Sequence, residues 1–182
     1  MEKNRTQRAR GIGRHLRAIA FASFLAALSI VCGKYLAIPV GTVLRFSLEN
    51  LPILLCGMVL GPAMGALTGA VADLVGCLMV GYVINPVVTL GAVAIGLCGG
   101  LVYRFLKNVA PFGRISIAVL LSHLIGSVVI KTFGLAVFFD MPFYALMLWR
   151  LLNYAIVGLV ELLALYSLLR NKSVRRQLEH LR

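Results

Sequence analysis

Polar and charged side chains that suit ligand binding interrupt an otherwise apolar sequence at four places. They are Arg45, Phe46, Glu49 and Asn50 in a first segment, Tyr82 and Asn85 in a second, Lys131 alone, and Arg150, Asn153 and Tyr154 in a last segment. Guanidinium and ammonium groups pair strongly with carboxylates, and a few polar groups in an apolar pocket fix the orientation of a small ligand. If these groups converge, they predict a site for a planar, hydrogen-bonding, anionic small molecule.

The composition places these groups in a membrane protein. The 182 residues are 60% hydrophobic and only 13% charged, with a mean hydropathy of +0.95. Soluble domains are about 45–50% apolar and about 25% charged, so an ordinary cytosolic enzyme, a disordered chain and a secreted disulfide scaffold are excluded. At about 20 apolar residues per crossing, the chain has room for about six membrane helices.

Proline and glycine breaks divide the chain into the expected helices. The breaks fall at 39–41, 61–62, 85–86, 111–113 and 140–142. The expected helices span about residues 16–36, 48–61, 62–81, 86–107, 114–139 and 143–169, with a loop over 41–47. The sequence therefore predicts an all-α integral membrane protein with six transmembrane helices. Its expected parts are a basic cytoplasmic N-terminal segment (1–15), a six-helix membrane domain (16–170) and a basic cytoplasmic tail (171–182).

The basic residues predict the orientation of the chain. Lys and Arg outnumber Asp and Glu by eighteen to six, and most of them lie in the two terminal segments or between the fourth and fifth helices. By the positive-inside rule, both termini are expected in the cytoplasm. The exceptions, expected near the outer side, are Lys34, Arg45, Lys131 and Arg150. The acids that could compensate them are Glu49, Asp73 and Asp140.

Each outer cation has a simpler interpretation, which is snorkelling toward water from a helix end. This applies most directly to Lys34 and Arg150. A charge that stays inside a membrane segment costs about 2.5–3.5 kcal/mol on insertion scales, which favours an anionic partner for Lys131. Nucleic-acid binding is not expected, because no basic stripe is interleaved with aromatic residues.

Sequence motifs for catalysis and metal binding are absent. There is no G-x-x-x-x-G-K-[ST] phosphate loop, no H-E-x-x-H, no G-x-S-x-G and no C-x-x-C pair. The histidines His15, His123 and His180 are scattered, so satisfied or solvated imidazoles are expected. Glu161 is expected to pair with hydroxyls or basic groups rather than to relay protons. We therefore predict no catalytic residues, no metal and no cofactor.

Two stripes of small residues predict close approaches between helices. The first lies on one face of the first helix and consists of Ala18, Ala22 and Ala26. It suits either packing within the bundle or contact with a second protein. The second stripe, where internal packing is expected, consists of Gly57, Gly61, Gly65 and Gly69. Asp73 extends this second stripe and needs a hydroxyl, amide or cation, for which Thr68 and Asn85 are the candidates.

A longer pattern runs from the first polar segment into the third helix. It reads Leu44-Arg45-Phe46-Ser47, Leu51-Pro52-Ile53, Gly57, Leu60-Gly61-Pro62, Gly65, Gly69 and Ala72-Asp73. With six expected helices in under 200 residues and the alanine stripe, this pattern resembles the substrate-binding S components of energy-coupling factor (ECF) vitamin transporters. The resemblance covers the whole chain apart from its tails and is greatest for the folate-specific branch.

This resemblance implies a transport subunit in the plasma membrane of a bacterium. Such a subunit captures a vitamin from outside in a pocket in its outer half. It then associates with a membrane coupling subunit and two cytosolic ATPase subunits, and toppling in the bilayer carries the pocket inward. The alanine stripe would face the coupling subunit, and the partners would consume the ATP.

Folate fits the polar side chains. The donor and acceptor edges of its pterin suit Glu49, Asn50, Asn85 or Asn153, and its ring could stack on Phe46 or Tyr82. The two carboxylates of its glutamate tail suit the cations at Arg45, Lys131 and Arg150.

Other functions compatible with the sequence stay open. Within the same family, the ligand could be riboflavin, pantothenate or a queuosine precursor, although riboflavin is uncharged and the outer cations argue against it. A stand-alone secondary transporter usually has more helices and internal repeats. A membrane scaffold without a ligand would leave the outer polar residues without a purpose.

Overall fold

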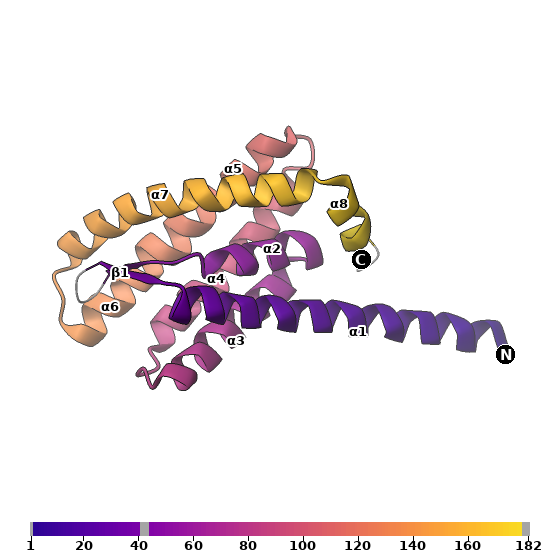
Figure 1. Cartoon of the computed structure of the whole chain (residues 1–182), viewed down its shortest axis with the longest axis horizontal. Coiled ribbons are helices and arrows are strands. Elements are labelled where there is room, and N and C mark those ends of the chain that lie inside the picture. Colours follow the sequence, from indigo (N-terminus) through magenta and orange to yellow (C-terminus); the bar gives the residue numbers. More distant parts are fainter. Residues whose placement is uncertain (1, 41–43, 180–182) are drawn as a thin grey trace.

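The computed structural model describes the backbone of residues 2–40 and 44–179, and within them the side chains of residues 13, 15–39, 46–172, 174, 176 and 177. Helices make up nearly all of it (Figure 1). In chain order the elements are α1 (Glu2–Ile30), the π-helix η1 (Val31–Tyr35), β1 (Ile38–Val40), β2 (Leu44–Phe46), α2 (Asn50–Leu60), α3 (Pro62–Val80), α4 (Pro86–Phe105), α5 (Pro111–Ser122), the π-helix η2 (His123–Ile130), α6 (Lys131–Phe139), α7 (Phe143–Arg170) and α8 (Lys172–Glu179).

Five helical segments of the described chain are long and apolar enough to cross a membrane. They span residues 15–35, 62–80, 86–105, 111–139 and 143–170. The remaining apolar helix, α2, has 11 residues and so spans about 16 Å, about half the thickness of a hydrocarbon core. Since nine of its residues are buried, α2 packs inside the bundle among α1, α3 and α4.

Most expected breaks coincide with helix boundaries. Proline begins α3, α4 and α5, where its missing N–H costs nothing. Gly61 (φ 106°) ends α2, and Asp140 (φ 50°) ends α6 in the left-handed region. These residues therefore stop the helices where the sequence predicts.

The structure differs from the expected boundaries at three places. The first helix continues through the expected N-terminal segment as far as Glu2, and residues 172–179 of the expected tail form α8. The expected loop instead contributes one strand of an antiparallel hairpin, in which Ile38 pairs with Phe46. This end of the bundle, with the α6–α7 connection beside the hairpin, is called the hairpin end, and the opposite end, with both termini, the termini end (Figure 1).

Glycine lets three helices touch through their backbones, as the second stripe predicts. A Cβ on Gly57 or Gly96 would overlap a backbone carbonyl oxygen of the facing helix, and so would one on Gly69. Helices α2, α3 and α4 therefore pack closer together than side chains would allow.

The alanine stripe on α1 is divided between the core and a cavity. Ala22 and Ala26 are buried in the hydrophobic core of this chain, whereas Ala18 is half-buried and lines a cavity at the termini end. The close packing that the alanine spacing predicts therefore occurs within this chain at Ala22 and Ala26.

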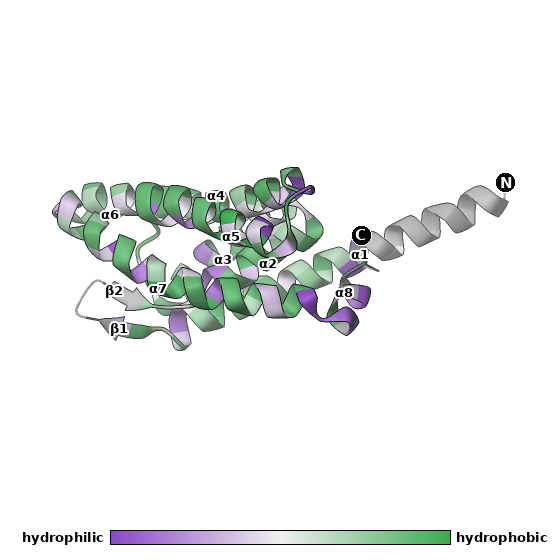
Figure 2. Cartoon of the chain, turned by 90° about the horizontal axis from the view of Figure 1, so that it is seen from above, coloured by the Kyte–Doolittle hydropathy of each residue, from purple (hydrophilic) through white to green (hydrophobic). Residues whose placement is uncertain are grey.

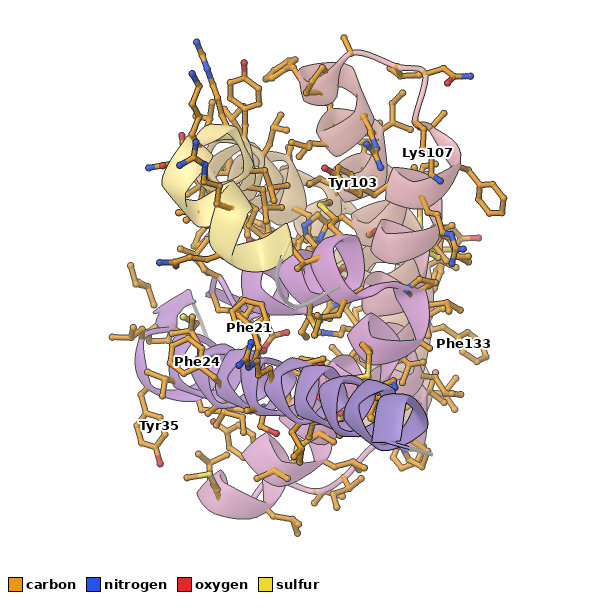
Figure 3. The ribbon with its side chains drawn as sticks, turned by 90° about the vertical axis from the view of Figure 1, so that its right-hand side faces the viewer. Phe21, Phe24, Tyr35, Tyr103, Lys107 and Phe133 are labelled. Atoms are coloured by element: carbon orange, nitrogen blue, oxygen red, sulfur yellow. The ribbon has the colours of Figure 1, made fainter. Side chains whose placement is uncertain are left out.

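Apolar side chains cover the outside of the bundle. Figure 2 shows apolar residues along the lengths of the helices and polar residues gathered in α8 and the connections. Phe24, Tyr35 and Phe133 project outward and are more than half exposed (Figure 3). A soluble protein rarely exposes an apolar surface this continuous, so this surface suits lipid.

Candidate functional site

An ion pair between Lys131 and Glu49 lies at the centre of the candidate site. Lys131, the first residue of α6, places its Nζ 2.9 Å from Oε1 of Glu49, which directly precedes α2. The Lys131 side chain is only 4% exposed, and that of Glu49 is 26% exposed. The structure therefore brings together two of the predicted ligand-binding residues, and they neutralise each other inside the bundle.

A cavity of about 130 Å³ adjoins this pair toward the hairpin end. Its lining consists of Lys34, Ser47, Glu49, Asp73, Val88, Lys131, Leu135, Arg150, Asn153 and Tyr154. A smaller cavity next to it is lined by some of the same side chains, including those of Lys34 and Asp73. Three cations and two carboxylates thus surround one space, which leaves an excess of positive charge for an anion.

Both lysines of the cavity lie on or beside π-helical turns. Lys34 belongs to η1, and Lys131 directly follows η2. Such turns interrupt regular helices frequently at functional sites. Lys34 Nζ donates to Sγ of Cys77 at 3.9 Å and lies 5.5 Å from the centre of the Tyr82 ring.

Three glycines make room for the charged side chains. A Cβ on Gly33 would lie 2.7 Å from Oε2 of Glu49, and one on Gly76 would lie 2.9 Å from Cε of Lys34. At Gly91, the added atom would lie 2.5 Å from Cγ of Lys131. Sequence patterns gave no sign of this role, because the glycines belong to helices other than those of the side chains they accommodate.

Asp73 finds a hydroxyl partner, but not the expected one. Oγ1 of Thr89 donates to its Oδ2 at 2.7 Å. The expected partner Thr68 lies 3.1 Å from Sγ of Cys56 instead. Thr89 is one turn after the start of α4, and only the packing of α3 against α4 brings it to Asp73.

Asn85, the other expected partner, is the N-cap residue directly before α4. Its Oδ1 accepts from the backbone N–H groups of Val87 and Val88 at 3.0 and 3.3 Å, and its Nδ2 donates to the carbonyl of Gly134 at 2.8 Å. The side chain is 4% exposed and lies outside the cavity lining. The carboxamide therefore serves as an N-cap that also fixes α6.

The other predicted site residues are dispersed around the cavity. Asn50 is fully buried, and its side-chain atoms have no hydrogen-bond partner within the described residues. Phe46 is half-buried and Tyr82 is exposed, and both lie outside the lining. The side chain of Arg45 lies outside the described residues, although its backbone belongs to β2.

Arg150 reaches the cavity from α7. Its Nη1 donates to the carbonyl of Ser127 at 2.8 Å, and its guanidinium lies 6.0 Å from the centre of the Tyr154 ring. Its Nε is buried without a hydrogen-bond partner in the described part of the chain. One N–H of the guanidinium is thus held by the protein, and the others, including the buried Nε–H, are left over.

A larger cavity of about 940 Å³ lies at the termini end. Its lining includes Ala18 and the basic residues His15, Arg104, Lys107 and Arg114, and Figure 3 shows Tyr103 and Lys107 of its wall at this end. The position agrees with the prediction that basic residues gather at one end of the bundle. Within the described residues, no group of three or more His, Cys, Asp or Glu could hold a metal ion.

The fold is shared with solved transport proteins. The chain is similar to the crystal structure of FolT bound with folic acid, with a TM-score of 0.68, 26% identity and coverage of 82% of this chain and 89% of that one. An S-component for biotin from an ECF-type ABC transporter gives a TM-score of 0.65 at 13% identity, covering 87% and 94%. An S component of a bacterial ECF transporter gives 0.55 at 15% identity, covering 91% and 96%.

No curated protein matches the chain. Its sequence nevertheless supports the same relationship through a family match. Residues 17–171 match the family described as ECF transporter, substrate-specific component. This range includes four of the five long apolar segments in full and nearly all of the first. This chain therefore belongs to the family of substrate-specific components of ECF transporters.

Proposed function

We propose that this protein captures folate at the cavity lined by η1, α3, α4, α6, α7 and the segment before α2, and delivers it with a membrane coupling subunit and two cytosolic ATPase subunits. The observation that carries the ligand assignment is the lining of this cavity, in which Lys34, Lys131 and Arg150 outnumber Glu49 and Asp73. Folate bears two carboxylates on its glutamate tail, and the similarity to FolT at 26% identity supports the same choice.

Different side chains of the cavity bind the two ends of the ligand. Lys34 and the free N–H groups of Arg150 bind the carboxylates of the tail, and Arg45 assists from β2. The carboxylate of Glu49 and the amide of Asn153 suit the donor and acceptor edges of the pterin, against which the ring of Tyr154 packs. We retain Asn50 as a candidate, because both of its side-chain polar atoms are buried without a partner among the described residues.

Capture of folate requires the walls of the cavity to separate. Its volume of about 130 Å³ is below the range of about 300–1,000 Å³ that is typical of small-molecule sites. The hairpin end faces the outside in this proposal, because the basic residues at the termini end favour the cytoplasm. Binding from outside then begins at the hairpin and at the start of α7.

The coupling subunit docks at the termini end, beside Ala18. This residue lines the larger cavity there, whereas Ala22 and Ala26 already pack in the core. The protein thus works as a multi-pass subunit of a bacterial plasma membrane, and its partners supply the ATP hydrolysis.

The test is folate binding to the purified protein in detergent, measured by calorimetry and by quenching of Trp149 fluorescence. Trp149 is the only tryptophan and adjoins Arg150. We expect saturable binding that weakens about tenfold in Lys34→Gln, equivalent to one lost charge-assisted contact, and that stays unchanged in Lys107→Gln at the opposite end. Absence of folate binding by folded protein would refute the ligand assignment, and a panel of riboflavin, pantothenate, biotin and queuosine precursors would then identify the ligand.

A further inference from the structure

A second buried pair of ionisable side chains lies next to the cavity, on its termini side. Nε2 of His123 is 2.6 Å from Oε2 of Glu161, and the two side chains are 5% and 0% exposed. The sequence leads us to expect a satisfied imidazole and a paired carboxylate, and the two groups contact each other, although Oε1 of Glu161 is buried without a hydrogen-bond partner in the described part of the chain. Ionisable groups inside a membrane bundle are costly and mark function by default, yet neither residue lines the cavity.

Two contacts lead from the His123 ring to the cavity wall. The ring stacks on that of Tyr154, with centres 4.9 Å apart and planes inclined by 25°. Its Nδ1 lies 3.3 Å from Oγ of Ser127. The carbonyl of the same serine accepts the hydrogen bond from Arg150, whose guanidinium also faces the Tyr154 ring at 6.0 Å.

The contact with Glu161 fixes the orientation of the imidazole. When Nε2–H donates a hydrogen bond to the carboxylate, Nδ1 of a neutral ring is an acceptor for the hydroxyl of Ser127. Both ring nitrogens are then occupied, and the face of the ring is held against that of Tyr154. The η2 turn supplies His123 and Ser127, and α7 supplies Tyr154, Arg150 and Glu161, so the contacts also join these two elements.

We propose that Glu161 and His123 are positioning residues that aim the guanidinium of Arg150 at a carboxylate of the ligand. They act through Ser127, which holds one nitrogen of the guanidinium, and through Tyr154, which packs beside it. Because only one N–H of Nη1 donates to Ser127, the other N–H groups of Arg150, including the buried Nε–H, are the donors left for the anion. This inference rests on the proposed function, because it assigns a role within the same binding site.

A double-mutant cycle on ligand affinity tests this proposal. His123→Phe keeps a ring to stack on Tyr154 but removes both hydrogen bonds, and we expect it to raise the Kd for folate about tenfold. In the Arg150→Gln background, the same change is expected to raise Kd less than about twofold. Glu161→Gln keeps an acceptor for Nε2 and should retain most of the affinity, whereas Glu161→Leu should match His123→Phe.

The control is Ser122→Ala, which removes a buried hydroxyl next to His123 that donates to the carbonyl of Ala118, on its own helix. It should leave the Kd unchanged. Calorimetry separates Kd from the fraction of active protein, so a variant that merely folds poorly lowers the stoichiometry alone. An equal loss of affinity with and without Arg150, or no loss in His123→Phe, overturns the proposal.

A readout without ligand keeps the two proposals separate. In protein labelled with ¹⁵N-arginine, the guanidinium resonances identified by their loss in Arg150→Gln should show hindered rotation, which His123→Phe releases. If the wild-type protein binds no folate but this release occurs, the folate assignment fails and the positioning role stands. If rotation is the same in both proteins, the positioning role fails whatever the ligand.

Discussion

Lys131 and Glu49 are 82 positions apart in the chain, yet their side chains meet at 2.9 Å inside the bundle. This contact joins the start of α6 to the start of α2. Removing one member of a buried ion pair is worse than removing both, because the remaining charge stays in an apolar environment. The pair therefore explains why a lysine is tolerated at a buried position of an apolar helix.

Glu49→Gln is expected to destabilise the protein by about 3–5 kcal/mol, since it leaves the buried Lys131 without its counter-charge. Lys131→Met should cost less, because the carboxylate of Glu49 is partly exposed. The double variant should recover much of the loss. Apparent melting temperatures in detergent give the comparison, and additive losses in the double variant would contradict it.

Gly91→Ala is expected to impair folate binding, whereas Gly76→Ala should be tolerated. The new methyl group at position 91 meets Cγ of Lys131 and the backbone oxygen of Gly126, and such overpacking costs about 1–3 kcal/mol. At position 76 its closest contact is the flexible end of Lys34. Calorimetry on both variants, with Gly113→Ala as a surface control, checks this order, and equal affinities at positions 76 and 91 would argue against it.

Thr89→Val should lower stability by about 1.5–3 kcal/mol, because it removes a hydrogen bond to the carboxylate of Asp73 without changing the volume. Thr89→Ser keeps the hydroxyl and serves as the matched control. Thermal unfolding in detergent measures both. Equal melting temperatures for the valine and serine variants would show that Asp73 does not depend on this contact.

Ala18→Leu is expected to abolish ATP-dependent uptake while leaving folate binding intact, if the coupling subunit docks beside the cavity at the termini end. Ala20→Leu, at an exposed position of the same helix outside the cavity lining, should leave both unchanged. The measurements are calorimetry on the isolated subunit and uptake by cells that carry the coupling subunit and ATPases. Normal uptake by Ala18→Leu would exclude this docking position.

The sequence predicts much of the fold because its signals are local. Prolines at 62, 86 and 111 begin helices, and Gly57, Gly65 and Gly69 of the glycine stripe pack closely against neighbouring helices, whereas Gly61 ends α2 with open space around it. The length of α2 was overestimated because Leu48 and Glu49 are no less compatible with a helix than the residues that follow. The hairpin was missed because its strands are only three residues long.

The site is less predictable because its partners come from different elements. The unexplained charges at Lys131 and Glu49 pointed to a polar site, and the two residues are in contact. Asn85 is likewise a polar residue in an apolar stretch of sequence, but its side chain caps helix α4 and does not line the cavity. The pairing of His123 with Glu161 has no local signature at all, since it depends on how α7 packs on η2.

Backbone contacts through glycine join four elements more tightly than α7 is joined to them. Gly57, Gly69, Gly91 and Gly126 leave no room for a side chain where α2, α3, α4 and η2 touch, so we expect these elements to move as one body. Helix α7 packs on that body around another glycine, Gly158, whose nearest contact is an ordinary 3.5 Å. The cavity is lined by Lys131 of α6 and by Arg150 of α7. A ligand that binds both cations would therefore hold α6 and α7 in a fixed relative position.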